Sequence, residues 1–198
     1  MLLNFNYDYP LYVIGTGVST DELIDFIQEE TIGPVYRIAK EDFFKLEDGA
    51  QCMLGFHNIE YRINLLREIK CLDRRWPTYI HPSATTFNSN QFGMGTVIGP
   101  QTYVGYGAKL GDFCALGPLI NIGHGSELGT NCVVSPGAII AGSTVIGDNV
   151  YIGLSSTIRD KISVCSNVTL HMTSVVTKPI TEPGIYVGNR RTTIDNSK

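Results

Sequence analysis

One histidine of this 198-residue chain stands where its side chain could act as a base. His124 lies between Gly123 and Gly125, two residues after Ile122, in a stretch where an aliphatic residue followed by glycine recurs. Among side chains, imidazole titrates nearest to neutral pH, so a histidine on a turn is a candidate general base. The alternative is a surface histidine without a catalytic role. The residues that the fold places beside His124 decide between the two.

The stretch around His124 belongs to a repeat of six residues. Aliphatic residues occupy all fourteen positions of this period, namely Ile98, Val104, Leu110, Leu116, Ile122, Leu128, Val134, Ile140, Ile146, Ile152, Ile158, Val164, Leu170 and Val176. Glycine directly follows eight of them, at positions 99, 105, 111, 117, 123, 129, 147 and 153. The residue four positions after the aliphatic one is mostly small: Thr102, Ala108, Cys114, Ser126, Cys132, Ala138, Thr144 and Ser156. This period suits neither an α-helix nor a simple alternating strand, and it predicts a solenoid with the aliphatic side chains inside.

If three repeats make one coil, residues eighteen apart stack at about one strand spacing, ~4.8 Å. The rule puts Gly142 directly over His124 and Tyr106 one coil below it. A glycine at that place leaves its backbone N–H accessible as a donor to a developing oxyanion. Glu127 stacks on Lys109 by the same rule, which favours a surface ion pair over a carboxylate that orients His124.

The first ~75 residues follow an α/β pattern. An apolar run at 11–17 ends at Gly15 and Gly17, and Ser19 or Thr20 would cap the helix that follows up to residue 30. Further strands are predicted at 34–38 and 51–56, a helix at 58–70, and a link at 74–84. We therefore expect an α/β domain at 1–78 and a solenoid domain at 79–198.

Composition excludes several classes of partner. The net charge is −4 and no basic stripe is present, which argues against nucleic acid binding. No apolar run approaches the ~18 residues of a membrane helix, and the N-terminus lacks a basic signal-peptide region. Five cysteines without a C-x-x-C pair fit free thiols in a reducing compartment. We expect a cytoplasmic protein.

The repeat resembles that of the hexapeptide-repeat acyltransferases, aliphatic-Gly-x-x-small-x, whose fold is a left-handed parallel β-helix of triangular section. With an α/β domain ahead of it, the chain resembles the nucleotide-sugar N-acetyltransferases of the PglD/NeuD/PerB type, which implies a Rossmann-like domain at 1–78 that binds the nucleotide sugar and a left-handed β-helix at 79–198. The matching stretches are the Gly15 turn, 55–62 (GFHNIEYR), 80–84 (IHPSA), 95–100 (GTVIGP), the His124 region and 184–191 (GIYVGNRR). The resemblance implies transfer of an acetyl group from acetyl-CoA to a nucleotide-linked amino sugar, such as a 4-amino-4,6-dideoxyhexose, for a surface glycan (O-antigen, capsule or glycoprotein). It also implies a homotrimer with active sites between subunits and no metal.

The resemblance assigns roles to individual residues. His124 would be the general base and the Gly142 N–H the acyl-oxygen donor. Acetyl-CoA would contact Gly142, Gly153, Leu154 and Met172, and its phosphates could meet Arg159, Lys161, Lys178, Arg190 and Arg191. The nucleotide sugar would contact Gly15, Thr16, Gly17, Gly55, Tyr106 and Asn121. Where the family usually has an acid after the histidine, this chain has Gly125, so a backbone carbonyl or a water would orient the ring instead.

Two other functions remain open, and the spacing of the histidines argues against a third. An O-acetyltransferase would share the fold, and a non-catalytic β-helix that binds a nucleotide sugar would explain the missing acid. A zinc carbonic anhydrase of the γ type needs three convergent histidines. His81, His124 and His171 are 43 and 47 residues apart, and neither separation is a multiple of eighteen.

Overall fold

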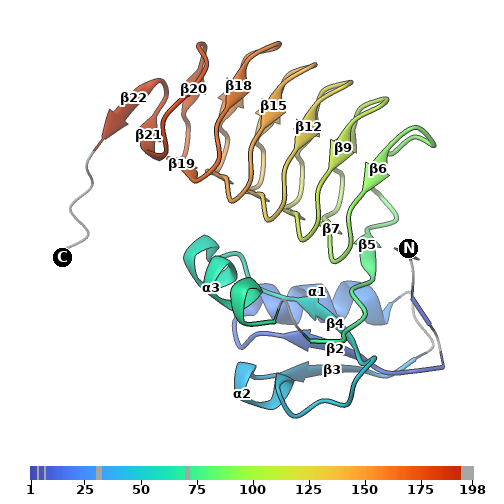
Figure 1. Ribbon diagram of the computed structural model, residues 1–198. Coiled ribbons are helices and arrows are strands. Elements are labelled where there is room, and N and C mark those ends of the chain that lie inside the picture. Colours follow the sequence, from blue (N-terminus) through green and yellow to red (C-terminus); the bar gives the residue numbers. More distant parts are fainter. Residues whose placement is uncertain (4, 7, 30–32, 70–71, 193–198) are drawn as a thin grey trace.

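The computed structural model describes residues 1–3, 5–6, 8–29, 33–69 and 72–192 (Figure 1). Its N-terminal part is a three-stranded parallel sheet in the order β3-β2-β4. The strands are β2 (Leu11–Ile14), β3 (Val35–Ile38) and β4 (Gln51–Leu54), and the helices are α1 (Val18–Gln28), α2 (Lys40–Phe43) and α3 (Ile59–Ile69). The predicted strands and the two longer helices are present, while α2 was not predicted. The predicted helix ends at residues 30 and 70 lie outside the described residues.

The start of α1 differs from the prediction. Its N-cap is Gly17, without a side-chain capping bond, so the expected cap by Ser19 or Thr20 is wrong. The reason is tertiary, because Thr20 is fully buried and its hydroxyl donates to the Gly55 carbonyl at 2.8 Å. This bond holds α1 against the loop that follows β4.

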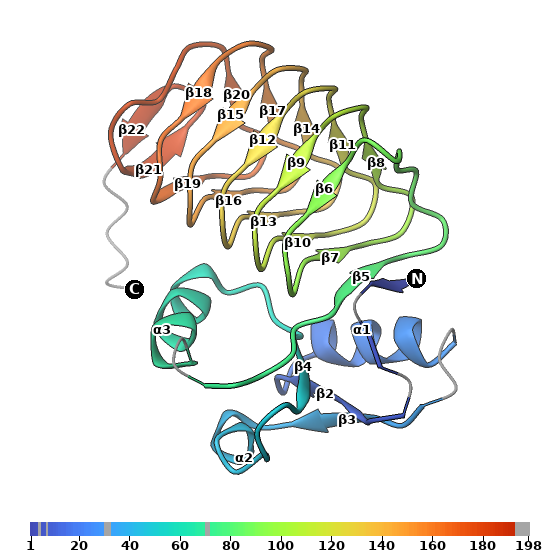
Figure 2. The ribbon, with the colours of Figure 1, turned by 45° about the vertical axis from the view of Figure 1, so that its right-hand side comes forward.

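The rest of the chain is a triangular parallel β-helix (Figure 2). The first face consists of β1 (Leu2–Leu3), β5 (Thr78–Ile80), β7 (Val97–Ile98), β10 (Ala115–Leu116), β13 (Val133–Val134), β16 (Tyr151–Ile152), β19 (Val168–Leu170), β21 (Gly184–Val187) and β22 (Arg190–Thr192). The second face consists of β8 (Tyr103–Val104), β11 (Asn121–Ile122), β14 (Ile139–Ile140), β17 (Thr157–Ile158) and β20 (Val175–Val176). The third face consists of β6 (Gln91–Phe92), β9 (Lys109–Leu110), β12 (Glu127–Leu128), β15 (Val145–Ile146) and β18 (Ser163–Val164).

The predicted stacking of residues eighteen apart is confirmed on every face. Ile122 pairs with Ile140 on the second face, for example, and Leu128 with Ile146 on the third. All fourteen aliphatic residues of the repeat are at most 3% exposed, and they form one continuous core with the small residues. Burial of these side chains is the main force that stabilises the coil.

The β-helix begins earlier than the repeat suggested. β5 and β6 precede Ile98, with Ile80 buried and Phe92 half-buried against the same core. Thr86 stands at the sixfold position between these two, so the aliphatic pattern breaks in this coil. β1 pairs antiparallel with β5, so Leu2 and Leu3 belong to the first face.

One arginine fixes the N-terminal part to the β-helix. Helices α1 and α3 lie against the first face (Figures 1 and 2), and Arg62 of α3 is 1% exposed. Its Nε donates to Asn131 Oδ1 at 2.9 Å, and its other nitrogens donate to the carbonyls of Phe56 and Phe113. Burial lowers the pKa of Arg62 to about 10, which still leaves the guanidinium charged at neutral pH. No helix in the described ranges is long and apolar enough to cross a membrane.

Candidate functional site

The turns between the faces form three edges, on which the residues two positions after each inward aliphatic residue are stacked. The His124 edge, between the second and third faces, carries Tyr106, His124, Gly142, Asp160 and Lys178. The Asp148 edge, between the third and first faces, carries Met94, Asp112, Thr130, Asp148 and Ser166. The Leu154 edge, between the first and second faces, carries Pro82, Pro100, Pro118, Pro136, Leu154 and Met172.

His124 covers Gly142, as the stacking rule predicts. A Cβ atom added to Gly142 would lie 2.7 Å from His124 Cε1 and 3.0 Å from each ring nitrogen. A Cβ atom added to Gly123 would lie 2.3 Å from the Gly142 nitrogen. Both positions must therefore be glycine for the exposed imidazole to lie flat beside the Gly142 backbone.

The backbone N–H groups of the stacked turn residues have different hydrogen-bond acceptors on the three edges. On the Asp148 edge, Thr130 N–H donates to Asp148 Oδ1 at 2.7 Å and Asp148 N–H donates to Ser166 Oγ at 2.9 Å. On the Leu154 edge, the first four residues are prolines and have no N–H. Among the residues that the structure describes, the N–H groups of His124, Gly142, Leu154 and Met172 have no acceptor. The N–H groups of Tyr106 and Asp160 on the His124 edge, and of Asp112 and Ser166 on the Asp148 edge, also have no acceptor in the described part of the chain. The donors of His124, Gly142, Leu154 and Met172 are free to bind a ligand.

No acid orients the His124 ring within the described part of the chain. The His124 carbonyl accepts from Ser143 N–H at 2.8 Å, which fixes the backbone, but the ring nitrogens have no partner there. Gly125 has φ +61°, in the left-handed region that favours glycine over Asp or Glu. The predicted Lys109–Glu127 ion pair is present at 2.7 Å with both side chains half exposed, so Glu127 is engaged on the third face.

The predicted phosphate-binding residues divide into two groups. Arg159, Lys161 and Lys178 lie on or beside the His124 edge, in the coils above Gly142, and Lys161 N–H donates to the Gly142 carbonyl at 3.1 Å. Arg190 and Arg191 lie on β22 in the first face, where Arg191 pairs with Glu182 at 2.9 Å. Asp160 stands directly above Gly142 and pairs with Arg159 at 3.7 Å, so the end of the His124 edge above Gly142 is charged with an excess of basic side chains.

The predicted acetyl-CoA contacts lie on two edges. Gly142 is on the His124 edge, whereas Gly153, Leu154 and Met172 are on the Leu154 edge, across the second face. Leu154 and Met172 are 45% and 61% exposed. One chain alone does not bring these residues together.

The glycines predicted to contact the nucleotide sugar have a packing role of their own. A Cβ atom on Gly15 would lie 2.2 Å from Thr20 Oγ1, and one on Gly55 would lie 2.8 Å from Thr20 Cγ2. Both glycines thus allow α1 to approach the sheet closely. Thr16 and Gly17 are exposed at the start of α1, and nothing lies within 4 Å of a Cβ atom on Gly17. A ligand therefore has access to this turn.

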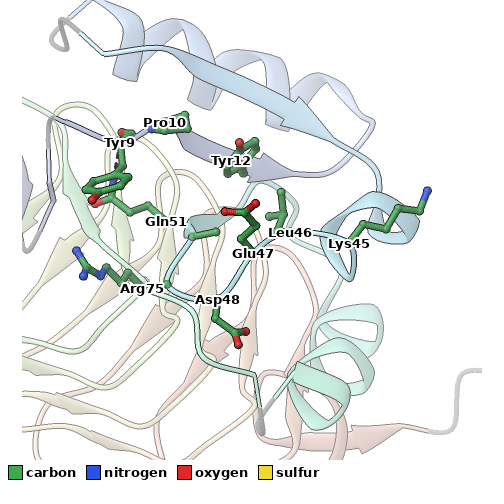
Figure 3. Close-up of a pocket in the computed structure, with 11 residues that line it drawn as sticks. Tyr9, Pro10, Tyr12, Lys45, Leu46, Glu47, Asp48, Gln51 and Arg75 are labelled. Atoms are coloured by element: carbon green, nitrogen blue, oxygen red, sulfur yellow. Dashed lines mark hydrogen bonds between the residues drawn. The ribbon is translucent and has the colours of Figure 1, made fainter.

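Besides a cleft of about 570 Å³ between the start of α3 and the first face, two clefts flank the N-terminal part. One lies between α1, the loop after β4 and the first face, and its lining includes Ser19, Gly55 and Pro118. The other, of about 510 Å³, lies at the amino ends of β2 and β4 (Figure 3), with Tyr12 and Glu47 in its wall. Ligands of parallel α/β sheets bind at the carboxyl ends of the strands, so the first cleft is the better candidate.

An aromatic cluster next to Tyr106 was not predicted. The Phe87 ring lies 5.9 Å from the Tyr103 ring and 6.2 Å from the Tyr106 ring, both edge-on. Tyr103 is paired with the predicted substrate contact Asn121 on the second face. The signal was available, because Tyr103 precedes Asn121 by eighteen residues, but the broken repeat at Thr86 concealed the coil that holds Phe87.

The described residues contain no group of three or more His, Cys, Asp or Glu that could hold a metal ion. His81 and His171 stand beside the Leu154 edge, whereas His124 is on another edge. The three histidines of the carbonic anhydrase reading therefore do not converge.

Comparison of the sequence with models of protein families and with curated proteins finds no match. Solved structures match nearly the whole chain. The acetyltransferase domain of PglB from Neisseria gonorrhoeae FA1090, in complex with acetyl coenzyme A, has a TM-score of 0.82 and 23% identity over 93% of this chain and 98% of that chain. PerB from Caulobacter crescentus, in complex with CoA and GDP-perosamine, has a TM-score of 0.80 and 16% identity over 92% and 96%. WeeI from Acinetobacter baumannii AYE has a TM-score of 0.78 and 17% identity over 93% and 99%. The chain shares their fold.

Proposed function

We propose that the protein is an N-acetyltransferase that moves the acetyl group of acetyl-CoA to the amino group of a nucleotide-linked amino sugar, such as a 4-amino-4,6-dideoxyhexose. The observation that carries the proposal is the His124 imidazole lying over Gly142, whose N–H has no acceptor in the described part of the chain. A base and an oxyanion donor side by side are what acyl transfer requires. Residues 1–78 would bind the nucleotide sugar and residues 79–198 would carry the chemistry, in the cytoplasm, for a surface glycan such as the O-antigen of lipopolysaccharide.

Each group of the site has one task in this reaction. His124 takes a proton from the sugar amine as the amine nitrogen attacks the thioester carbonyl carbon. The Gly142 N–H donates to the carbonyl oxygen, which becomes negatively charged. When the carbon–sulfur bond breaks, the imidazolium returns the proton to the departing CoA sulfur. The amide product and free CoA thiol account for all atoms.

The two substrates approach from opposite ends of the His124 edge. Arg159, Lys161 and Lys178 above Gly142 suit the phosphates of acetyl-CoA, and the free N–H groups of Leu154 and Met172 suit its amide chain. The opposite end, with Tyr106 and Asn121, is left for the sugar. Gly15, Thr16, Gly17 and Gly55 would hold the nucleotide near the N-terminus of α1, where backbone N–H groups favour phosphate. Bound acetyl coenzyme A in the PglB domain and GDP-perosamine in PerB support these two substrate classes.

The site calls for more than one copy of the chain. The N-terminal part lies against the first face, and the His124 edge is the one opposite that face. Gly153, Leu154 and Met172 are on a further edge. A homotrimer of β-helices side by side would bring the His124 edge of one copy to the Leu154 edge and N-terminal part of others.

The test is turnover with a defined panel. The protein is incubated with acetyl-CoA and with UDP-, dTDP- and GDP-linked 4-amino-4,6-dideoxyhexoses, together with matched sugars that carry a hydroxyl at C4. Free thiol and the mass of the product are followed. We expect thiol release and an N-acetyl product with at least one amine. Turnover of the hydroxyl sugars alone would replace the proposal with an O-acetyltransferase, and binding without turnover would make the protein a non-catalytic nucleotide-sugar binder.

A further inference from the structure

Three exposed aromatic side chains surround the lower end of the His124 edge. Phe87, Tyr103 and Tyr106 are 38%, 39% and 68% exposed, and the Phe87 ring contacts both tyrosines edge-on. The cluster is joined directly to the coil of His124. Gly125 N–H donates to the Tyr106 carbonyl at 2.9 Å, and Tyr103 is paired with Asn121.

The cluster is held in place by its own turn. Phe87 N–H donates to Asn90 Oδ1 at 2.6 Å, and Asn90 Nδ2 donates to the Gly105 carbonyl of the next coil at 2.7 Å. The residues that stack above Phe87 are Gly105 and then Gly123. Because neither has a side chain, nothing from these two positions covers the Phe87 ring on the side toward His124.

The chemistry of the His124 edge thus changes along its length. Above Gly142 the side chains are charged, with three basic residues and one acid, and below His124 they are aromatic and include two tyrosine hydroxyl groups. Each aromatic ring offers a flat apolar face, and tyrosine hydroxyls add hydrogen bonds beside it. This combination suits a hexose, which has C–H groups on one face of the ring and hydroxyl groups around it. Phosphates suit the other end.

We propose that Phe87, Tyr103 and Tyr106 are the platform on which the acceptor hexose stacks, with its amino group directed up to His124. The proposal rests on the N-acetyltransferase function and adds the residues that hold the sugar. The platform selects hexoses with an apolar group at C6, because a methyl group gains more from contact with the aromatic rings than a hydroxymethyl group does. Asn121 and the hydroxyl of Tyr103 bond the ring hydroxyls.

The first experiment measures steady-state kinetics of Phe87→Leu and Tyr106→Leu with the best nucleotide amino sugar. Tyr9→Leu is the matched control, since Tyr9 is 57% exposed at the far side of the N-terminal sheet. We expect KM for the sugar to rise about tenfold in each platform variant. The KM for acetyl-CoA and the oligomeric state should not change, and the control should behave as wild type.

The second experiment compares 6-deoxy and 6-hydroxy forms of the same nucleotide amino sugar. The wild-type protein should prefer the 6-deoxy form in kcat/KM, and Phe87→Leu should lose most of that preference. Wild-type turnover with an unchanged sugar KM in both variants would overturn the platform and leave the N-acetyltransferase function standing. Dissociation of the oligomer in the variants would overturn it too, by assigning the cluster to contact between copies. Absence of wild-type turnover with every amine would overturn both proposals.

Discussion

The His124 edge and the Asp148 edge are made by the same six-residue repeat and differ in what closes the turn. On the Asp148 edge, the carboxylate of Asp148 accepts the Thr130 N–H of the coil below. On the His124 edge, Gly142 has no side chain, and its own N–H has no acceptor in the described residues. The backbone is equivalent in both places. The side chains therefore determine whether the N–H of a turn is hydrogen-bonded within the chain or available to a ligand.

Along the Leu154 edge, the lower turns have no backbone N–H donor and the upper turns have a free one. Pro82, Pro100, Pro118 and Pro136 remove the donor from the lower turns, and Leu154 and Met172 restore it above them. The free donors begin one coil above Pro136, at Leu154. On this edge, donors are thus absent at the four prolines and present at Leu154 and Met172, which we propose to contact acetyl-CoA.

The largest effect on activity is expected from His124→Ala. Loss of the base should lower kcat by ~10² or more and leave the Kd for CoA unchanged. The matched control is Thr130→Ala, the corresponding turn position on the Asp148 edge, which keeps the Thr130 N–H bond to Asp148. The control should retain wild-type kcat. Equal activity of His124→Ala and wild type in the thiol-release assay would remove His124 from the base role.

Gly142→Ala should affect activity next most strongly. The added Cβ would lie 2.7 Å from His124 Cε1, and the imidazole is the mobile end of its side chain. The ring should therefore move, lowering kcat by about tenfold to 10²-fold with little change in Tm. Gly142→Pro would also remove the donor and should lower kcat further.

Gly129→Ala on the Asp148 edge is the control for the two Gly142 variants. Its Cβ would lie 2.3 Å from Asp148 Oδ1 and 2.8 Å from the Asp148 nitrogen, which is backbone and cannot move aside easily. The expected result is the reverse, a lower Tm with kcat unchanged. If Gly142→Ala lost stability and kept activity, the contact between His124 and Gly142 would be structural only.

Leu154→Pro tests the free donors of the Leu154 edge with a smaller effect. Gly153 precedes Leu154 as Gly99 precedes Pro100, so the turn should accept proline without strain. Loss of the N–H should raise KM for acetyl-CoA by about fivefold. Leu154→Ala keeps the N–H and should change KM less. Equal effects of the two variants, measured side by side, would assign the contact to the leucine side chain.

The repeat allowed the β-helix and the centre of the candidate site to be predicted from the sequence. Each inward aliphatic residue packs on the residues eighteen positions before and after it. A separation of eighteen in the sequence therefore corresponds to direct contact in space. This is why Gly142 could be placed over His124, and Glu127 on Lys109, before the structure was known. The aromatic cluster at Phe87 was not predicted, because Thr86 interrupts the aliphatic pattern in this coil.

The N-terminal part was less predictable because its contacts have no period. Thr20 looked like a helix cap, yet its hydroxyl is taken by the Gly55 carbonyl, 35 residues away. Arg62 bonds Asn131 across 69 residues, and no spacing rule connects them. Local preferences are overridden by such tertiary contacts. The position of the N-terminal part on the first face could be seen only in the structure.

The smallest effect is expected from Asp148→Ala, which removes the side chain that accepts the Thr130 N–H. Thr130 N–H would lose its acceptor, and because this turn is exposed to water the free energy of unfolding should fall by only about 1 kcal/mol. Asp148→Asn keeps an oxygen acceptor and should lose less. Both should keep wild-type kcat, measured alongside thermal unfolding. A large loss of activity would mean that the Asp148 edge also serves the reaction. A loss of stability alone would show that the bond from Thr130 N–H to Asp148 is structural.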